Sequence, residues 1–140
     1  MLHLVKLAVG IRDLAHLAER QAARAVSDPP LRHQTRMFPR RAEEIVAGGS
    51  IYWVVTGVVL VRQRIVEIRQ EAWDDGTSCA GLILDPKLVQ VEARPMRAFQ
   101  GWRYLAADDA PPDLESSRPG RGEAAMPPAL RRELATLCLL

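Results

Sequence analysis

The spacing of hydrophobic and polar positions predicts how the chain begins. The segment 2–9 is rich in leucine and valine, which predicts a buried strand. An amphipathic helix is predicted between Asp13 and Pro29, because Asp13 can cap its first turn and Pro29 cannot continue it. Gln21 is the one polar residue on the apolar stripe of this helix. The segment 33–37 is expected to be extended.

A second, shorter helix and a group of strands are predicted next. Pro39 suits the first turn of the helix, and the glycines at 48 and 49 end it. β-Branched and aromatic residues then predict strands at 51–55, 58–68, 79–84 and 88–93. Asp85-Pro86-Lys87 is expected to link the last two, and 94–104 to be irregular. Arg62 and Arg64 lie two residues apart on one strand face, which Val66 and Ile68 would share unless a bulge intervenes. Either the sheet curls there, or the strand leaves the core at Arg62 and re-enters at Ile65.

These elements favour an α+β fold, with a small curled mixed sheet or open β-barrel and two or three flanking helices. Residues 1–105 are expected to form one domain. Residues 106–127 hold most of the Asp, Ser, Pro and Gly of the C-terminal third and predict a flexible linker. Residues 128–140 predict a C-terminal helix docked on the domain, because so short a helix is marginal alone in water.

Charge is distributed unevenly along the chain, although the net charge is only +2. Arginines gather without acidic residues in 31–41 and again in 94–103, whereas 108–115 is acidic. A guanidinium offers a flat, bidentate fork that also stacks on rings. The two arginine-rich segments therefore favour an anionic or planar partner, which the net charge alone does not indicate.

The cysteines and the apolar segments indicate which sites and which cellular location to expect. Cys79 and Cys138 are far apart and in no Cys-x-x-Cys pair, so neither a metal site nor a cofactor is predicted. The apolar start is too short for a signal peptide, and no apolar run reaches the roughly 18 residues of a membrane span. We expect a reduced, cytoplasmic protein with no membrane or metal partner, and a homodimer is compatible with the sequence.

The predicted ligand-binding residues combine guanidinium, amide and indole groups. They are Arg36, Arg40, Arg62, Arg64, Gln100, Trp102 and Arg103. The alternative is that several arginines form ordinary ion pairs, as Arg40 and Glu44 could across one helical turn. Trp53 is expected in the core, and Gln63 either reads a base edge or ties down irregular backbone. No catalytic residue is predicted.

Several motifs together resemble a bacterial family, domain of unknown function 1489. The resemblance spans nearly the whole chain. Its motifs are Leu4-x-Lys6-Leu7-x-Val9-Gly10, Thr35-Arg36-Met37-x-Pro39, Gly49-Ser50-Ile51-Tyr52-Trp53-Val54, Arg62-Gln63-Arg64-Ile65, Asp85-Pro86 and Phe99-Gln100-Gly101-Trp102-Arg103-Tyr104. The family brings no assigned activity.

A more distant likeness is to the PUA/ASCH group of small β-barrels, which bind RNA or modified bases. It rests on a short helix leading into a strand, a glycine turn and a second strand, between residues 40 and 68. The Gly-x-Lys-x-x-Glu-x-Arg signature of the ASCH branch is absent. The likeness therefore implies a fold more than a set of site residues.

Three hypotheses follow. The first is a non-enzymatic PUA-like domain that binds RNA or a nucleotide-like ligand through its arginines and Trp102. The second is an enzyme acting on a nucleotide or phosphorylated metabolite, with Glu44 as the general base. The third is a protein-interaction module that uses the C-terminal helix.

Overall fold

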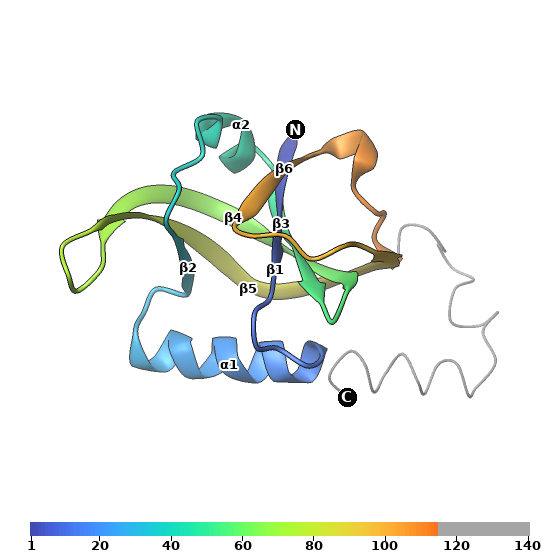
Figure 1. Cartoon of the computed structure of the whole chain (residues 1–140), viewed down its shortest axis with the longest axis horizontal. Helices are drawn as coiled ribbons and strands as arrows, with labels where there is room; N and C mark the ends of the chain where they lie inside the picture. The colour runs from blue at the N-terminus through green and yellow to red at the C-terminus, as the bar shows by residue number, and fades with distance from the viewer. Residues whose placement is uncertain (115–140) are drawn as a thin grey trace.

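The computed structural model describes residues 1–114, which form an open six-stranded mixed sheet with two α-helices beside it (Figure 1). In chain order the elements are β1 (Leu2–Leu7), α1 (Leu14–Ser27), β2 (Arg32–Thr35), α2 (Ala42–Val46), β3 (Ser50–Val55), β4 (Val58–Ala72), β5 (Ser78–Pro95), β6 (Trp102–Ala106) and the 3₁₀ turn η1 (Ala107–Asp109). The strand order is β2-β5-β4-β3-β1-β6. The α+β class predicted from the sequence is confirmed.

The sheet is mixed because β1 and β3 run parallel, whereas every other neighbouring pair is antiparallel. Parallel neighbours need a crossover, and α1, β2 and α2 lie on it between β1 and β3. The side chain of Asp13 accepts a 2.8 Å hydrogen bond from the amide of His16 and caps α1, as predicted. Leu14 and Leu17 then bury the inner side of α1 against the sheet.

Strands β4 and β5 form one long hairpin, and here the sequence prediction of separate strands at 79–84 and 88–93 is wrong. Both stretches belong to the continuous strand β5. The residues 85–87 form a bulge in it, since Ile65 pairs with Leu84 and Gln63 already pairs with Leu88. Aspartate before proline usually marks a turn, but here the extra residues are absorbed within the strand. A bulge does intervene in β4 between Arg64 and Ile68, since Ile65 pairs with Leu84 and Glu67 with Ile83.

The sheet curls strongly. The rings of His33 in β2 and Trp53 in β3 lie 5.2 Å apart, although β5 and β4 separate these strands in the sheet order. The edge strands β2 and β6 do not pair with each other, so the sheet stays open. Trp53 is 4% exposed and belongs to the core beneath α1, as expected.

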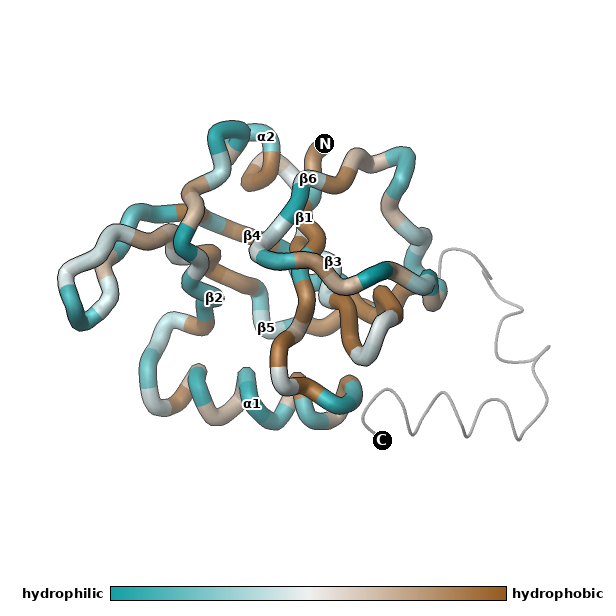
Figure 2. Tube along the Cα trace, viewed as in Figure 1, coloured by the Kyte–Doolittle hydropathy of each residue, from teal (hydrophilic) through white to brown (hydrophobic). Residues whose placement is uncertain are grey.

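The opposite face of the sheet carries a second, smaller core. Hydrophobic residues gather along β3 and its neighbouring strands (Figure 2). Neighbouring residues of β3 point to opposite faces, so Tyr52 lies in the second core and Trp53 in the first. The second core consists of Val5, Tyr52, Val54, Val59 and Val91. Side chains after β5, such as Phe99, Leu105 and Ala110, pack against it.

The segment 94–104 is less irregular than predicted, since β5 continues to Pro95 and β6 begins at Trp102. Beyond β6 the chain stays on the body of the protein: the amide of Glu92 donates to the carbonyl of Pro112 at 2.9 Å, and Val91 bridges to Asp113. The rest of the predicted linker and the predicted C-terminal helix lie outside the described residues. Neither α-helix of the described chain has the length and apolar character for a membrane crossing.

Candidate functional site

The two arginine-rich segments of the sequence meet in the structure. The indole N–H of Trp102 in β6 donates a 2.9 Å hydrogen bond to the carbonyl of Met37, in the loop between β2 and α2. The hydroxyl of Tyr104, also in β6, accepts a 3.1 Å hydrogen bond from the amide of Arg41. The guanidinium of Arg41 lies 5.7 Å from the centre of the Tyr104 ring. Strand β6 thus holds the loop that carries the first arginine cluster.

This junction leaves hydrophobic side chains exposed next to unpaired cations. Met37 is 68% exposed, Phe38 43% and Tyr104 37%. Arg36 and Arg40 are exposed, and no carboxylate among residues 1–114 forms an ion pair with either. We call the whole set the arginine/aromatic surface: Arg36, Met37, Phe38, Arg40, Arg41, Trp102 and Tyr104.

Arg103 and Gln100 lie outside the arginine/aromatic surface, on its flank. Successive residues of β6 point to opposite faces, so Arg103 projects away from Trp102 and Tyr104. Its guanidinium lies 4.5 Å from the centre of the Phe99 ring, a cation–π contact. Gln100 is exposed in the turn before β6. The structure therefore brings Arg36, Arg40 and Trp102 together and leaves Arg103 and Gln100 on the flank.

Arg62 is engaged by the chain itself. Its Nε and Nη2 donate to the carboxylate of Asp113 at 2.7 and 2.8 Å, and Nη1 donates to the hydroxyl of Ser50 at 3.0 Å. The side chains of Arg62 and Asp113 are 25% and 24% exposed. Hydrogen bonding from Arg62 lowers the pKa of Asp113. Arg62 thus clamps residues 107–114 to β4, where the sequence suggested a free phosphate-binding group.

The polar group around Arg62 extends to the first strand. The Nδ1 atom of buried His3 accepts a 2.9 Å hydrogen bond from the amide of Ser50, and its ring meets the Tyr52 ring edge-on at 5.0 Å. Burial lowers the pKa of His3, and the charge of Arg62 acts in the same direction. Ser50 is fully buried and serves as a brace.

Arg64 has a structural role as well. Its guanidinium donates to the carbonyls of Val46 and Gly49 at 2.8 and 3.0 Å, and to that of Ile65. It thereby satisfies carbonyls at the end of α2, which lack partners inside the helix. A Cβ at Gly49 would lie only 2.0 Å from the carbonyl oxygen of Leu2, so this junction is closely packed.

Gln63 ties down irregular backbone, which was one of its two predicted roles. Its amide exchanges hydrogen bonds of 2.8 and 2.7 Å with that of Gln21. It also accepts from the Trp53 indole at 3.1 Å and donates to the carbonyl of Asp85, at the β5 bulge, at 2.9 Å. The polar position on the apolar stripe of α1 is thereby explained.

Glu44 is not placed as a general base should be. The helix-turn ion pair forms with Arg41 rather than with Arg40: the guanidinium donates to the two carboxylate oxygens at 2.5 and 2.7 Å. Hydrogen bonding from Arg41 lowers the pKa of Glu44, which is exposed to solvent. A carboxylate with a lowered pKa is a weaker base.

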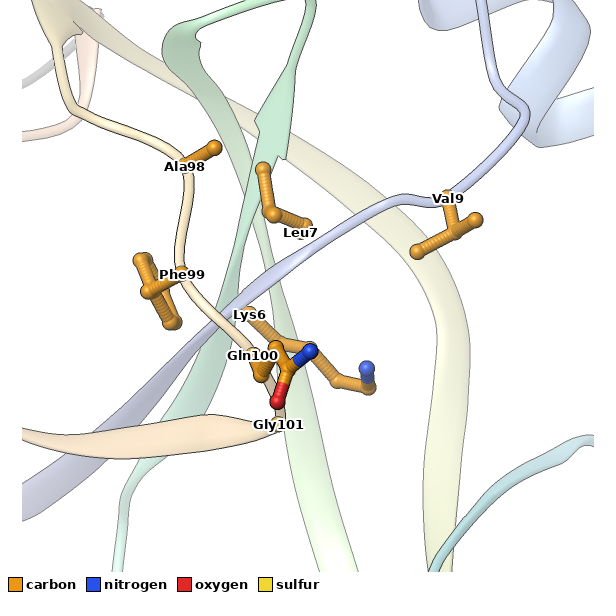
Figure 3. A pocket seen from close by; sticks show the side chains of 7 residues that line it. All are labelled: Lys6, Leu7, Val9, Ala98, Phe99, Gln100 and Gly101. Atoms are coloured by element: carbon orange, nitrogen blue, oxygen red, sulfur yellow. The ribbon is translucent and has the colours of Figure 1, made fainter.

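A hollow of about 490 Å³ lies between the end of β1 and the residues before β6 (Figure 3). Residues 98–101 line one side, and Lys6, Leu7 and Val9 line the other. Burial lowers the pKa of Lys6. Sequence reasoning missed this lysine, although lysine is rare here and this one interrupts an apolar strand.

A comparison with family models matches residues 4–140 to a family described as a protein of unknown function (DUF1489). The chain belongs to this family. The family resemblance read from the sequence motifs is therefore confirmed. No curated protein and no solved structure matches the chain, so the likeness to the PUA/ASCH group is not confirmed.

For this member of the DUF1489 family, the described residues hold no group of three His, Cys, Asp or Glu side chains that could bind a metal ion. Cys79 is buried and has no disulfide partner within the described part of the chain. Its pKa is raised by burial, which keeps it a thiol.

Proposed function

We propose that the protein is a non-enzymatic binding domain for RNA or a nucleotide-like ligand, and that the arginine/aromatic surface makes the contact. The observation that carries the proposal is the hydrogen bond between Trp102 and the carbonyl of Met37. It joins two segments that are far apart in sequence and leaves Arg36 and Arg40 beside exposed rings.

The chemistry of this surface suits a nucleic acid strand. Guanidinium forks match phosphate oxygens and bind without base preference. Phe38 and Tyr104 are exposed enough to stack on bases, and each aromatic platform contributes roughly 1–3 kcal/mol in single-strand binders. Arg103 and Gln100 extend the contact around the β6 edge. Arg62 and Arg64 support the fold instead, because internal carboxylate and carbonyl groups occupy them.

The finer fold assignment belongs to the same proposal. A short helix, α2, leads into β3, and the turn at Thr56-Gly57 leads into β4. This order within a curled open sheet supports a PUA/ASCH-like architecture, whose members bind RNA or modified bases. A cytoplasmic location would fit that role.

The other two hypotheses have less support. An enzyme on the same surface needs a general base, and Glu44 is held in an exposed ion pair with Arg41. The protein-interaction hypothesis, and with it the homodimer, rests on the C-terminal helix, which lies outside the described residues.

Fluorescence anisotropy with short labelled RNA and DNA across a salt series tests the proposal. We expect a preference for RNA, and we expect the salt slope of the Arg36→Ala/Arg40→Ala variant to fall by about 0.7 for each lost phosphate contact. The matched control is Arg20→Ala/Arg24→Ala, which removes the same charge from the exposed part of α1. If both double variants lose the same RNA affinity, the binding is nonspecific attraction to positive charge. If the unmodified protein binds no RNA even at low salt, the proposal is excluded.

A further inference from the structure

The hollow beside β1 contains a cation without an acidic partner. Lys6 lies at the centre of a three-strand row, paired with Trp53 of β3 on one side and Trp102 of β6 on the other. Its side chain is half-buried, and it forms no hydrogen bond or ion pair with any of residues 1–114. A half-buried ammonium loses hydration that no carboxylate replaces, so an anion from outside would stabilise it.

The charged groups that act on His33, a neighbour of Lys6, are also cations. The ring of His33 lies edge-on against Trp53, and its Nε2 is buried without a hydrogen-bond partner in the described part of the chain. Burial lowers the pKa of His33 to about 4, and the charges of Lys6 and Arg24 act in the same direction. Among residues 1–114, no acidic group is a cause of a raised pKa for His33 or Lys6. Lys6 thus lies near a buried neutral imidazole and supplies the positive charge at this end of the sheet.

The walls of the hollow are mostly apolar. Leu7, Val9 and Ala98 border it, and Lys6 and Gln100 supply the polar side chains (Figure 3). The hollow has a volume of about 490 Å³ and is open to solvent.

We propose that this hollow binds a small organic carboxylate with an apolar body. The ammonium of Lys6 pairs with the carboxylate, the Gln100 amide donates a second hydrogen bond, and the apolar body rests on Val9 and Ala98. One cation between apolar walls suits a monoanion better than a phosphate, because a phosphate carries more charge and needs several donors. This site lies beside the flank of the proposed nucleic acid surface and shares only Gln100 with it.

The chain itself supplies a matched control, because Lys6 and Lys87 are its only lysines. Lys87 is exposed at the β5 bulge. The full-length protein, labelled with ¹³C-lysine, is titrated with phenylacetate and, separately, with its uncharged analogue 2-phenylethanol and with inorganic phosphate. We expect phenylacetate to shift the Hε–Cε signal of Lys6 saturably and to raise the pKa of Lys6, while the Lys87 signal stays in place.

Equal shifts of both lysine signals, or no saturable shift, would overturn the proposal. If 2-phenylethanol shifts the Lys6 signal as much as phenylacetate does, the hollow binds apolar groups and is not an anion site. If phosphate binds more tightly than phenylacetate, the ligand is not a carboxylate. Each of these results counts against the carboxylate.

Variants give an independent test. Lys6→Met keeps the apolar length of the side chain and should weaken phenylacetate binding by at least about tenfold, whereas Lys87→Met should not. Gln100→Ala should weaken phenylacetate binding by several-fold. Gln100 is exposed in a turn, so this variant should fold normally. Unchanged phenylacetate affinity in either Gln100→Ala or folded Lys6→Met would contradict the assigned contacts. RNA binding by Lys6→Met, measured in parallel, separates failure of this site from failure of the proposed function.

Discussion

Arg62 grips the carboxylate of Asp113 with two hydrogen bonds of 2.7 and 2.8 Å, across a separation of 51 residues. The pair fastens the residues after β6 to the middle of β4. Both side chains are about three-quarters buried, so screening by water is limited.

Asp113→Ala should lower the free energy of unfolding by about 1–3 kcal/mol, because the guanidinium is left partly buried without its carboxylate. Urea denaturation at neutral pH measures this change. Asp108→Ala is the control, since Asp108 is exposed in η1 and its side chain has no hydrogen bond within the described chain. Similar effects of the two substitutions would show that the Arg62 contact adds little to stability.

Gln63→Leu should lower the free energy of unfolding by about 2–4 kcal/mol, because the Trp53 indole and the Asp85 carbonyl lose a buried partner. The added substitution Gln21→Leu should recover part of the loss, since two leucines can pack where the amides exchanged hydrogen bonds. A double-mutant cycle by urea denaturation measures the coupling. Gln70→Leu, at an exposed hairpin position, is the control, and a purely additive cycle would contradict the paired-amide interpretation.

Stability should depend on pH through Glu71. Burial acts to raise its pKa, but hydrogen bonds from Arg69, Arg32 and Gln34 outweigh it and hold the pKa at about 2. Because the folded pKa lies below the unfolded value of about 4.3, this stabilisation is complete above that pH and disappears as the pH falls toward 2. The difference in unfolding free energy between the unmodified protein and Glu71→Gln should therefore shrink between pH 5 and 2. A constant difference across that range would be inconsistent with it.

His33 should add a separate pH dependence at higher pH. Its pKa in the folded protein is about 4, below the unfolded value of about 6.5. The unfolded state therefore binds more protons in this window, and stability should fall as the pH decreases from 6.5 to 4. NMR titration of the imidazole should give its folded pKa, and Phe in place of His33 should reduce the slope of stability against pH. A measured pKa near 6.5 would refute the prediction.

Trp102→Phe should loosen the arginine/aromatic surface, because phenylalanine cannot donate to the Met37 carbonyl. We expect a loss of about 1 kcal/mol in unfolding free energy and weaker RNA binding. Trp73→Phe is a suitable control, since Trp73 lies in the hairpin turn and its indole has no hydrogen bond within the described chain. Weakened RNA binding in both variants would argue against a specific role for Trp102.

The sequence predicted correctly those features that are determined by residues close together in the chain. The alternation of Tyr52 and Trp53 gave two opposite faces of β3, and Asp13 gave the start of α1. The Asp-Pro pair at 85–86 was interpreted as a turn between two strands, but it lies in a bulge of one strand. Turns and bulges use the same residue types, and only the pairing with the neighbouring strand distinguishes them. Strand β6 was missed because arginine and glycine around residue 102 obscure its alternation.

The candidate site was harder to predict because its partners are distant in sequence. Nothing near Arg62 in the chain indicates that Asp113 will occupy it, and nothing near Arg64 indicates the carbonyls of α2. The arginine clusters at 31–41 and 94–103 were visible as composition, and the structure joins them through Trp102. Lys6 was not recognisable as a site, because only the fold shows that it has no partner among residues 1–114.

The course of the chain after β6 affects how the protein can be shortened. Pro111 is buried, and Ala110 packs on the core formed by Tyr52 and Val91. A protein cut at the end of β6, where sequence patterns place the domain boundary, would uncover this apolar face and free the Arg62 side chain. Such a fragment should be prone to aggregation, whereas one that retains residues up to 114 keeps its cover.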